Sequence, residues 1–237
     1  MDGHSLLGRL AAEPRLAALL LDLDGVLAPI VARPEDASVP AETRAELERL
    51  AGRYALVAVI TGRDGEDARA RTGVAGVVYV GSHGLELAEG AEAWAERLQA
   101  FAATVDWPLE RKRLTLSFHY RAAADEHEAL RVLEGVAERA RDEGLVARFG
   151  RKVLEVLPPL EADKGTAATH LLAERGLRRA LYAGDDTTDL DGFRALDGLE
   201  LAVRVAVASA EGPPELREAA DLVVASPAAF LELLRSL

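Results

Sequence analysis

The chain has 237 residues, no cysteine and a formal net charge of −12 at pH 7. That length suffices for one α/β core with an insertion or for two small domains, and the lack of cysteine excludes disulfides and thiolate metal sites. The negative charge argues against nucleic acid as a partner, because binding a phosphate backbone normally requires a basic face.

Short apolar runs, too continuously apolar for surface helices, recur along the chain and alternate with stretches of helical spacing. We interpret these runs as strands buried on both faces of a parallel sheet. The alternation predicts right-handed βαβ units and a doubly wound α/β fold. The expected strands lie near residues 17–21, 55–60, 77–80, 180–183 and 201–207.

The interval 85–160 breaks this rhythm. Its pattern reads as a helix near residues 91–105, a strand at 114–119, a long charged helix, and short strands near 146–149 and 153–157. Segregated helices and short strands of this kind indicate an α+β unit. We therefore predict a core of residues 1–84 and 161–237 with an inserted α+β cap over residues 85–160.

Two aspartates, Asp22 and Asp24, follow the first expected strand directly and run into Gly25. Open α/β sheets bind ligands at the carboxyl ends of their strands, and residues two apart point the same way, so both carboxylates can address one small volume. Two anions that close repel each other unless a cation lies between them. The alternative is a pair of solvated turn aspartates, since Asp and Gly are common in loops.

Candidate phosphate donors follow the second strand and open a later helix. Thr61 and the N–H groups around Gly62 are good donors to phosphate oxygens, and Arg63 comes next. Lys164 begins a helical stretch and is a compact charge suited to a phosphoryl group. The alternatives are a simple strand terminator for Thr61 and a solvated surface residue for Lys164.

Three carboxylates, those of Asp185, Asp186 and Asp189, follow the strand expected at 180–183. Together they form an oxygen-rich corner of the kind that Mg²⁺ prefers. Asp186 and Asp189 have a second interpretation, as the cap of a helix that begins near Leu190.

In this order the four motifs resemble the signature motifs of the haloacid dehalogenase superfamily of phosphotransferases. They read Asp22-Leu23-Asp24-Gly25, Thr61-Gly62-Arg63, Lys164-Gly165 and Gly184-Asp185-Asp186-Thr187-Thr188-Asp189. Within that superfamily the chain is similar to the trehalose-6-phosphate phosphatases, from about residue 19 to 230. Three stretches carry this narrower resemblance: Gly81-Ser82-His83-Gly84-Leu85-Glu86, Glu110-Arg111-Lys112 with His119-Tyr120-Arg121, and Gly150-Arg151 with Glu155-Val156.

The resemblance implies two-step hydrolysis of a phosphate monoester. Asp22 would attack phosphorus and form an aspartyl-phosphate, and Asp24 would give a proton to the leaving oxygen and later take one from water. The phosphate-binding residues implied are Thr61, Gly62, Arg63 and Lys164, with Thr61 and Lys164 stabilising charge during transfer.

The resemblance also implies a bound Mg²⁺. Its ligands would be Asp22, the backbone carbonyl of Asp24, and Asp185. Asp186 and Asp189 would orient the water ligands of the ion.

Charged residues of the expected cap are the candidates for recognising the sugar, whose hydroxyls call for carboxylate and cationic partners. From the residues alone, exposed charges on a solvated sheet face are the alternative. His83, in a glycine-flanked loop, suits a substrate contact or a loop-structuring role, and His119 is interpreted as structural. By resemblance, the cap residues that hold the glucose ring are Glu110, Lys112, Arg121, Arg151 and Glu155.

Two positions depart from the family pattern, which usually has lysine where Arg151 stands and more often threonine where Val26 stands. The hypothesis is a Mg²⁺-dependent trehalose-6-phosphate phosphatase that acts on a small-molecule sugar phosphate. We expect a cytoplasmic monomer that binds neither nucleic acid nor membrane, because no stretch approaches the roughly 20 apolar residues of a membrane span. The alternatives are a phosphatase for sucrose phosphate or a mannosyl phosphate ester, a sugar phosphomutase, and a non-catalytic sugar-phosphate-binding regulator.

Overall fold

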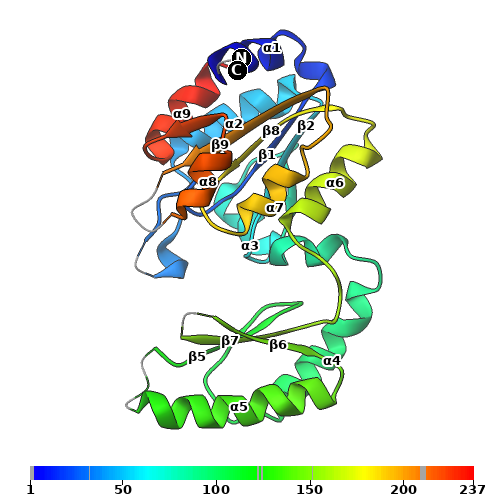
Figure 1. The fold of residues 1–237 in the computed structure, drawn as a ribbon, viewed down its shortest axis with the longest axis vertical. Helices are drawn as coiled ribbons and strands as arrows, with labels where there is room; N and C mark the ends of the chain where they lie inside the picture. Colours follow the sequence, from blue (N-terminus) through cyan, green and yellow to red (C-terminus); the bar gives the residue numbers. More distant parts are fainter. Residues whose placement is uncertain (1–2, 32, 122, 124, 151, 209–211) are drawn as a thin grey trace. The chain divides into compact units, whose positions relative to one another are not determined.

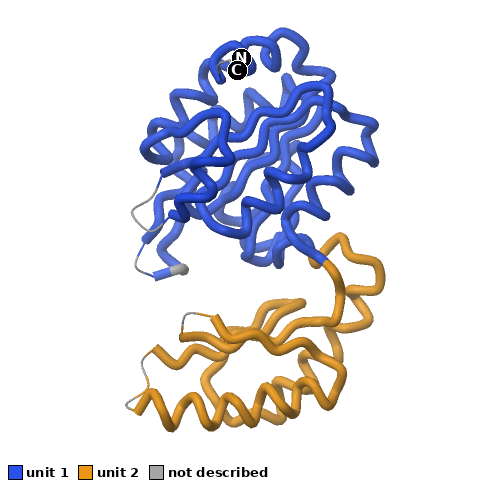
Figure 2. Tube along the Cα trace, in the orientation of Figure 1, with its two compact units in different colours: residues 1–84, 162–237 blue, residues 85–161 orange. Residues whose placement is uncertain are grey.

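The computed structural model describes residues 3–31, 33–121, 123, 125–150, 152–208 and 212–237. The chain forms two compact units (Figure 2). The first combines Met1–Gly84 with Ala162–Leu237, and the second is Leu85–Glu161. In the described ranges, no helix combines the length and apolar character needed to cross a membrane.

A six-stranded sheet forms the centre of the first unit, and all of its strand pairings are parallel. Its strand order is β10-β9-β8-β1-β2-β3. The bounds are β1 Ala18–Leu21, β2 Leu56–Ile60, β3 Val78–Val80, β8 Arg179–Gly184, β9 Leu201–Val207 and β10 Leu222–Val224. Every residue of β1 and β2 is buried, because helices lie on both faces of the sheet (Figure 1). This burial is why these strands read as unbroken apolar runs.

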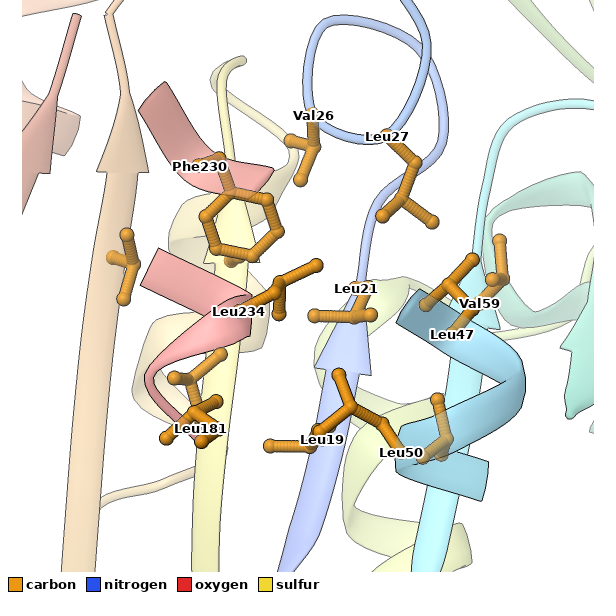
Figure 3. Close-up of a cluster of buried hydrophobic side chains, with 14 of the residues drawn as sticks. Leu19, Leu21, Val26, Leu27, Leu47, Leu50, Val59, Leu181, Phe230 and Leu234 are labelled. Carbon is orange, nitrogen blue, oxygen red and sulfur yellow. The ribbon is translucent and has the colours of Figure 1, made fainter. Parts of the chain in front are cut away.

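Helices from both ends of the chain pack on one face of this sheet. Leu19 and Leu21 of β1 point into a buried cluster that includes Leu47 of one helix and Leu234 of another (Figure 3). The helices that contribute to this face are α1 Gly3–Ala12, α2 Ala41–Arg53, α3 Gly65–Thr72 and α9 Pro227–Arg235. Val26, a departure from the family pattern, is 1% exposed and lies in the same cluster, so its side chain contributes packing.

The opposite face carries α6 Lys164–Glu174, α7 Asp189–Arg194 and α8 Pro214–Ala219. Tyr182 of β8 and Phe193 of α7 meet edge to face there, with ring centroids 6.0 Å apart. Short 3₁₀ helices connect the larger elements at η1 Pro14–Leu16, η2 Pro34–Asp36 and η3 Ser82–Leu87.

An antiparallel sheet in the order β4-β5-β7-β6 forms the second unit, together with two helices. The elements are α4 Ala91–Ala103, β4 Glu110–Arg111, β5 Leu116–His119, α5 Glu126–Asp142, β6 Val146–Gly150 and β7 Val153–Leu157. Leu116 and Phe118 of β5 pack with Leu154 of β7 and with both helices in a separate core. Alternation along the strands leaves Ser117, His119 and Glu155 on the other face.

The predicted fold class, a doubly wound α/β core with an inserted α+β unit, is confirmed. All the strands expected in the parallel sheet are present, with ends shifted by a residue or so. The strand expected at 114–119 is present but shorter: β5 begins at Leu116. Helices α1 and α9 and the short edge strand β10 were not predicted.

Candidate active site

The four motifs meet at the carboxyl edge of the parallel sheet. Strand β1 lies between β2 and β8, and Leu21 is level with Val59 and with Ala183. Asp22 and the segments that begin at Thr61 and Asp185 therefore leave the sheet at one level. This is the point where the strand order reverses, since β2 and β3 extend to one side and β8, β9 and β10 to the other. Open α/β sheets bind their ligands at such switch points.

Asp22 and Lys164 form a buried ion pair at this edge. Lys164 Nζ lies 2.9 Å from Asp22 Oδ2 and 2.8 Å from Asp189 Oδ1, and both the Lys164 and Asp189 side chains are almost fully enclosed. Asp22 Oδ1 accepts a hydrogen bond from the Leu23 N–H at 2.7 Å. The nucleophile predicted from sequence is thus held by a cation and a backbone donor.

The start of α6 fixes the position of Lys164. Asp163 is the N-cap: its side chain accepts from the Thr166 N–H, and its own backbone N–H donates to the Thr166 hydroxyl. The chain approaches this cap closely at Gly84, where a Cβ would lie 2.5 Å from the Asp163 carbonyl oxygen. Position 84 therefore accommodates only glycine, since its φ of +99° also disfavours residues with a Cβ.

Asp189 organises the turn that carries Asp185. Its Oδ1 accepts from Lys164 and from the Tyr182 hydroxyl, at 2.8 and 3.1 Å. Its Oδ2 accepts from the backbone N–H groups of Asp185 and Asp186, both at 3.0 Å. Since both oxygens already accept two bonds, Asp189 holds Lys164 and the turn in place. The sequence left open whether Asp189 caps α7, whose first residue it is; the observed bonds instead run to the turn before the helix.

The negative charge of the carboxylates at this site exceeds the positive charge of Lys164. Burial, together with Asp189 and Asp185 and against the attraction of Lys164, raises the pKa of Asp22 to about 8. Burial and the charge of Asp189 raise the pKa of Asp185 to about 7. Burial opposes the charge of Lys164, but its two carboxylate neighbours outweigh burial and raise its pKa. Ionised together, three carboxylates and one ammonium carry two uncompensated negative charges.

A divalent cation matches that excess charge. Oxygen atoms of Asp22, Asp185 and Asp189 lie within 4.8 Å of one another. Because both oxygens of Asp189 already accept two hydrogen bonds, Asp22 and Asp185 are the carboxylates of this group that can bind a cation. The backbone at Gly25 lies directly against the Asp185 carboxylate, because a Cβ there would lie only 2.1 Å from Asp185 Oδ2. An all-oxygen set of carboxylates and nearby carbonyls suits a hard cation such as Mg²⁺. The residues therefore fit a bound divalent metal ion.

Thr61 and Gly62 form the neighbouring loop. Thr61 is 1% exposed, and its N–H and C=O are bonded to Val80 and His83. The His83 ring lies against Gly62, where a Cβ would be 2.5 Å from His83 Nε2. His83 has a φ of +53°, so the backbone is held in an unusual conformation to place this ring.

Arg63 contacts the second aspartate of the first motif. Its Nε donates to Asp24 Oδ2 at 2.6 Å and its Nη2 to Asp24 Oδ1 at 2.9 Å, a two-pronged pair. The assignment of Arg63 to phosphate binding stays a prediction. Asp186 lies at the exposed end of the same edge, where its Oδ1 accepts from the Thr187 N–H at 2.7 Å.

In the second unit, several candidate sugar-binding residues share the sheet face without helices. Glu110, Ser117 and Glu155 are level with one another across β4, β5 and β7. Glu110 Oε1 lies 3.9 Å from Lys112 Nζ, and Glu110 Oε2 lies 3.1 Å from His119 Nε2. The exposed His119 ring therefore belongs to the charged face, a role the sequence analysis missed.

The remaining cap candidates are less informative. Arg121 is exposed in a turn after β5, and Arg151 lies outside the described residues. The sequence analysis also missed Tyr182, Asp67 and Arg71, which bond to predicted site residues or to their partners. The spacing of Asp67 and Arg71, four residues apart in α3, was a usable signal for a pair on one helix face.

The family model described as trehalose-phosphatase matches residues 20–108 and 103–227. The chain belongs to the trehalose-phosphatase family. A trehalose-phosphate phosphatase of Mycolicibacterium paratuberculosis is 36% identical over 211 residues, covering 78% of this chain and 52% of the relative. A crystal structure of the Aspergillus fumigatus trehalose-6-phosphate phosphatase matches with a TM-score of 0.67 and 25% identity, over 99% of this chain and 96% of that one.

The chain spans about half the length of the curated trehalose-phosphate phosphatases of Mycolicibacterium paratuberculosis, Mycobacterium avium and Mycobacterium marinum. It spans a smaller part of an uncharacterized glycosyl hydrolase of Mycobacterium tuberculosis, which is 35% identical over 230 residues, covering 85% of this chain and 17% of that protein. The family model, by contrast, covers nearly all of the chain, including the parallel sheet and the inserted unit.

Proposed function

We propose that this chain hydrolyses trehalose 6-phosphate to trehalose and inorganic phosphate, with Asp22 as the nucleophile. The observation that best supports the proposal is the buried pair of Asp22 and Lys164 at the switch point of a trehalose-phosphatase fold. A carboxyl group that is sheltered from bulk water and held 2.9 Å from a fixed ammonium group is positioned for attack on phosphorus.

In the proposed first step, four groups near the end of β1 act on the phosphate ester. Asp22 attacks phosphorus and forms an aspartyl-phosphate, while Asp24 donates a proton to the leaving sugar oxygen. Lys164 has three N–H donors, of which two engage Asp22 and Asp189, so the third is directed to a phosphoryl oxygen. Thr61 and the backbone N–H groups near Gly62 bind the other oxygens.

In the second step Asp24, now a carboxylate, takes a proton from the water that hydrolyses the aspartyl-phosphate. Asp22 is regenerated as the phosphate leaves, and Lys164 remains paired with Asp189 throughout. Proton balance is kept, since Asp24 gives one proton to the sugar and recovers one from water.

The proposed cofactor is Mg²⁺, held by Asp22, the backbone carbonyl of Asp24, and Asp185. When bound, it would neutralise charge between the carboxylates and the phosphoryl group. Asp189 keeps the Asp185 turn in the required conformation through its bonds to two backbone N–H groups. Asp186, at the exposed end of the turn, is proposed to orient a water ligand of the ion.

The second unit is proposed to recognise the sugar. Glu110, Lys112, Arg121 and Glu155 carry the charges that suit sugar hydroxyls, and Arg151 is assigned with them by family resemblance. His83, in the first unit, is the proposed contact nearest to the phosphate loop. We further propose that the protein is a cytoplasmic monomer.

Phosphate release tests this function. Purified protein is assayed with trehalose 6-phosphate, sucrose 6-phosphate, glucose 6-phosphate and p-nitrophenyl phosphate, with Mg²⁺ and then with EDTA. We expect metal-dependent hydrolysis with the highest kcat/KM on trehalose 6-phosphate, and none in an Asp22→Asn variant that still unfolds cooperatively. Preference for another ester would retain Asp22 and reject the sugar assignment, and no turnover of any ester would reject the enzyme.

A further inference from the structure

A chain of alternating charges runs from Asp24 along one face of α3. Arg63, just before this helix, bonds both oxygens of Asp24 and also donates from Nη1 to Asp67 Oδ2 at 3.2 Å. Asp67 Oδ2 accepts a second bond from Arg71 Nε at 2.7 Å. The spacing of four residues places Asp67 and Arg71 on one face of α3, and Arg63, just before the N-cap Asp64, meets Asp67 from the preceding segment.

The chain of charges ends on the backbone of another segment. Arg71 Nη1 donates to the carbonyl oxygens of Glu35 and Ala37, at 3.1 and 2.6 Å. These residues belong to the loop that follows the Asp24 turn. The network therefore joins the two sides of that loop, with Asp24 at one end and the Ala37 backbone at the other.

Partial burial makes these contacts specific. The Arg63 and Arg71 side chains are 15% and 18% exposed, whereas Asp24 is 37% exposed. The most exposed of these three side chains is thus held by a more buried partner. Burial alone would raise the pKa of Asp67, but the bonds from Arg71 and Arg63 outweigh it and lower that pKa. Asp67 stays ionised at neutral pH as an acceptor between two guanidinium groups.

We propose that Asp67 is a positioning residue that acts through Arg63 to fix the carboxyl group of Asp24 for proton transfer. The proposal rests on the function proposed above, in which Asp24 handles the proton. Arg63 has a planar, rigid set of donors, so an acceptor on one side of the guanidinium sets the plane in which the other side meets Asp24. Without the Asp67 carboxylate, the guanidinium group of Arg63 can rotate, and the carboxyl group of Asp24 is no longer held in one orientation.

Comparison of two leaving groups separates this role from a purely structural one. A sugar alkoxide needs a proton as it leaves, whereas nitrophenolate leaves without one. Because kcat/KM reports only the steps through alcohol release, a misplaced Asp24 lowers it for a sugar phosphate and not for p-nitrophenyl phosphate. General acid catalysis contributes about 10²- to 10⁴-fold, so we expect Asp67→Asn to lower kcat/KM by about 10- to 100-fold on trehalose 6-phosphate.

Three further variants serve as controls. Glu66→Gln removes a charge from the exposed neighbour in the same helical turn and should leave both substrates within about threefold. Asp67→Glu keeps the acceptor and should restore most of the lost activity. Arg71→Lys keeps the charge but loses the two-carbonyl anchor, and should give a smaller loss with the same preference. Equal losses on both substrates for Asp67→Asn, or no loss on trehalose 6-phosphate, would overturn the proposal.

A measurement without substrate keeps this test distinct from the proposed function. In the folded protein, exchange of the Arg63 Nε–H with solvent, followed by NMR, reports its bond to Asp24. We expect exchange at least tenfold faster in Asp67→Asn and unchanged in Glu66→Gln. Slow exchange in Asp67→Asn would overturn the positioning role, while failure of wild-type protein to hydrolyse trehalose 6-phosphate would remove only the proposed substrate. In that case the comparison of kcat/KM would pair p-nitrophenyl phosphate with whichever sugar phosphate the wild-type protein does hydrolyse.

Discussion

Replacement of Gly25 by alanine tests the metal site through a single added methyl group. Gly25 has a φ of +80°, and a Cβ at this position would lie 2.1 Å from Asp185 Oδ2. Gly198 has nearly the same φ, +78°, but a Cβ added there would meet no atom within 4 Å. Gly25→Ala and Gly198→Ala therefore share the backbone strain, and only Gly25→Ala displaces Asp185.

The shared strain sets the expected loss of stability. An L-residue in the left-handed region costs about 1 to 2 kcal/mol, which corresponds to a fall of about 2 to 8 °C in Tm for a protein of this size. Both variants should show this loss in EDTA. In wild-type protein, Mg²⁺ at about 100 times its Kd adds about 2.7 kcal/mol to the free energy of unfolding.

The test measures Tm and the rate of phosphate release for both variants and the wild-type protein across a Mg²⁺ titration. For Gly25→Ala we expect most of the Mg²⁺-dependent rise in Tm to vanish, with activity reduced at least 100-fold, because Asp185 must leave its place. Gly198→Ala should keep both the rise and the activity. A Gly25→Ala protein with normal Mg²⁺ dependence and normal turnover would show that the approach of Asp185 to this turn has no part in metal binding.

Three other predictions concern the buried charges. Tyr182→Phe removes the hydroxyl bond to Asp189 and should lower the free energy of unfolding by about 1 kcal/mol in urea titrations. Lys164→Met leaves two buried carboxylates without their cation; it should abolish phosphate release and cost about 3 kcal/mol, and retained activity would exclude Lys164 from catalysis. Burial raises the pKa of Asp22 from 3.8 to about 8 and that of Asp185 from 3.8 to about 7. The folded chain therefore binds more protons than the unfolded chain over that interval, so in EDTA stability should fall as the pH rises from about 4 to 8. Mg²⁺ should flatten this slope, and an equal slope with and without Mg²⁺ would contradict the assignment.

The parallel sheet was predictable because its central strands are buried on both sides. Residues 18–21 and 56–60 contain only apolar residues, a pattern that short fully buried strands impose. The elements that were missed have weaker signals. Strand β10 has three residues at the sheet edge, and α1 and α9 become recognisable only when their apolar faces meet the sheet. Tertiary contacts, rather than local preference, define these elements.

At the site, the residue types at the strand ends were predictable, but their partners were not. The roles of Asp189 depend on Lys164, Tyr182 and two backbone N–H groups, and only the fold brings these together. The pair of Asp24 with Arg63 joins positions 39 residues apart, so spacing alone could not reveal it. Helical spacing did contain the link between Asp67 and Arg71, which lie four residues apart in α3.

The close approach of Gly84 to Asp163 has a consequence for how such a protein diversifies. Both residues belong to the first unit: Gly84 is its last residue before the chain enters the second unit, and Asp163 follows Ala162, where the chain returns. An insertion whose ends are already neighbours adds little closure entropy to the host, whatever its length. A short linker in place of Leu85–Glu161 should thus leave the host sheet able to fold. Under the proposed function, a different segment grafted there would change the sugar that is recognised and leave Asp22 and Lys164 in place.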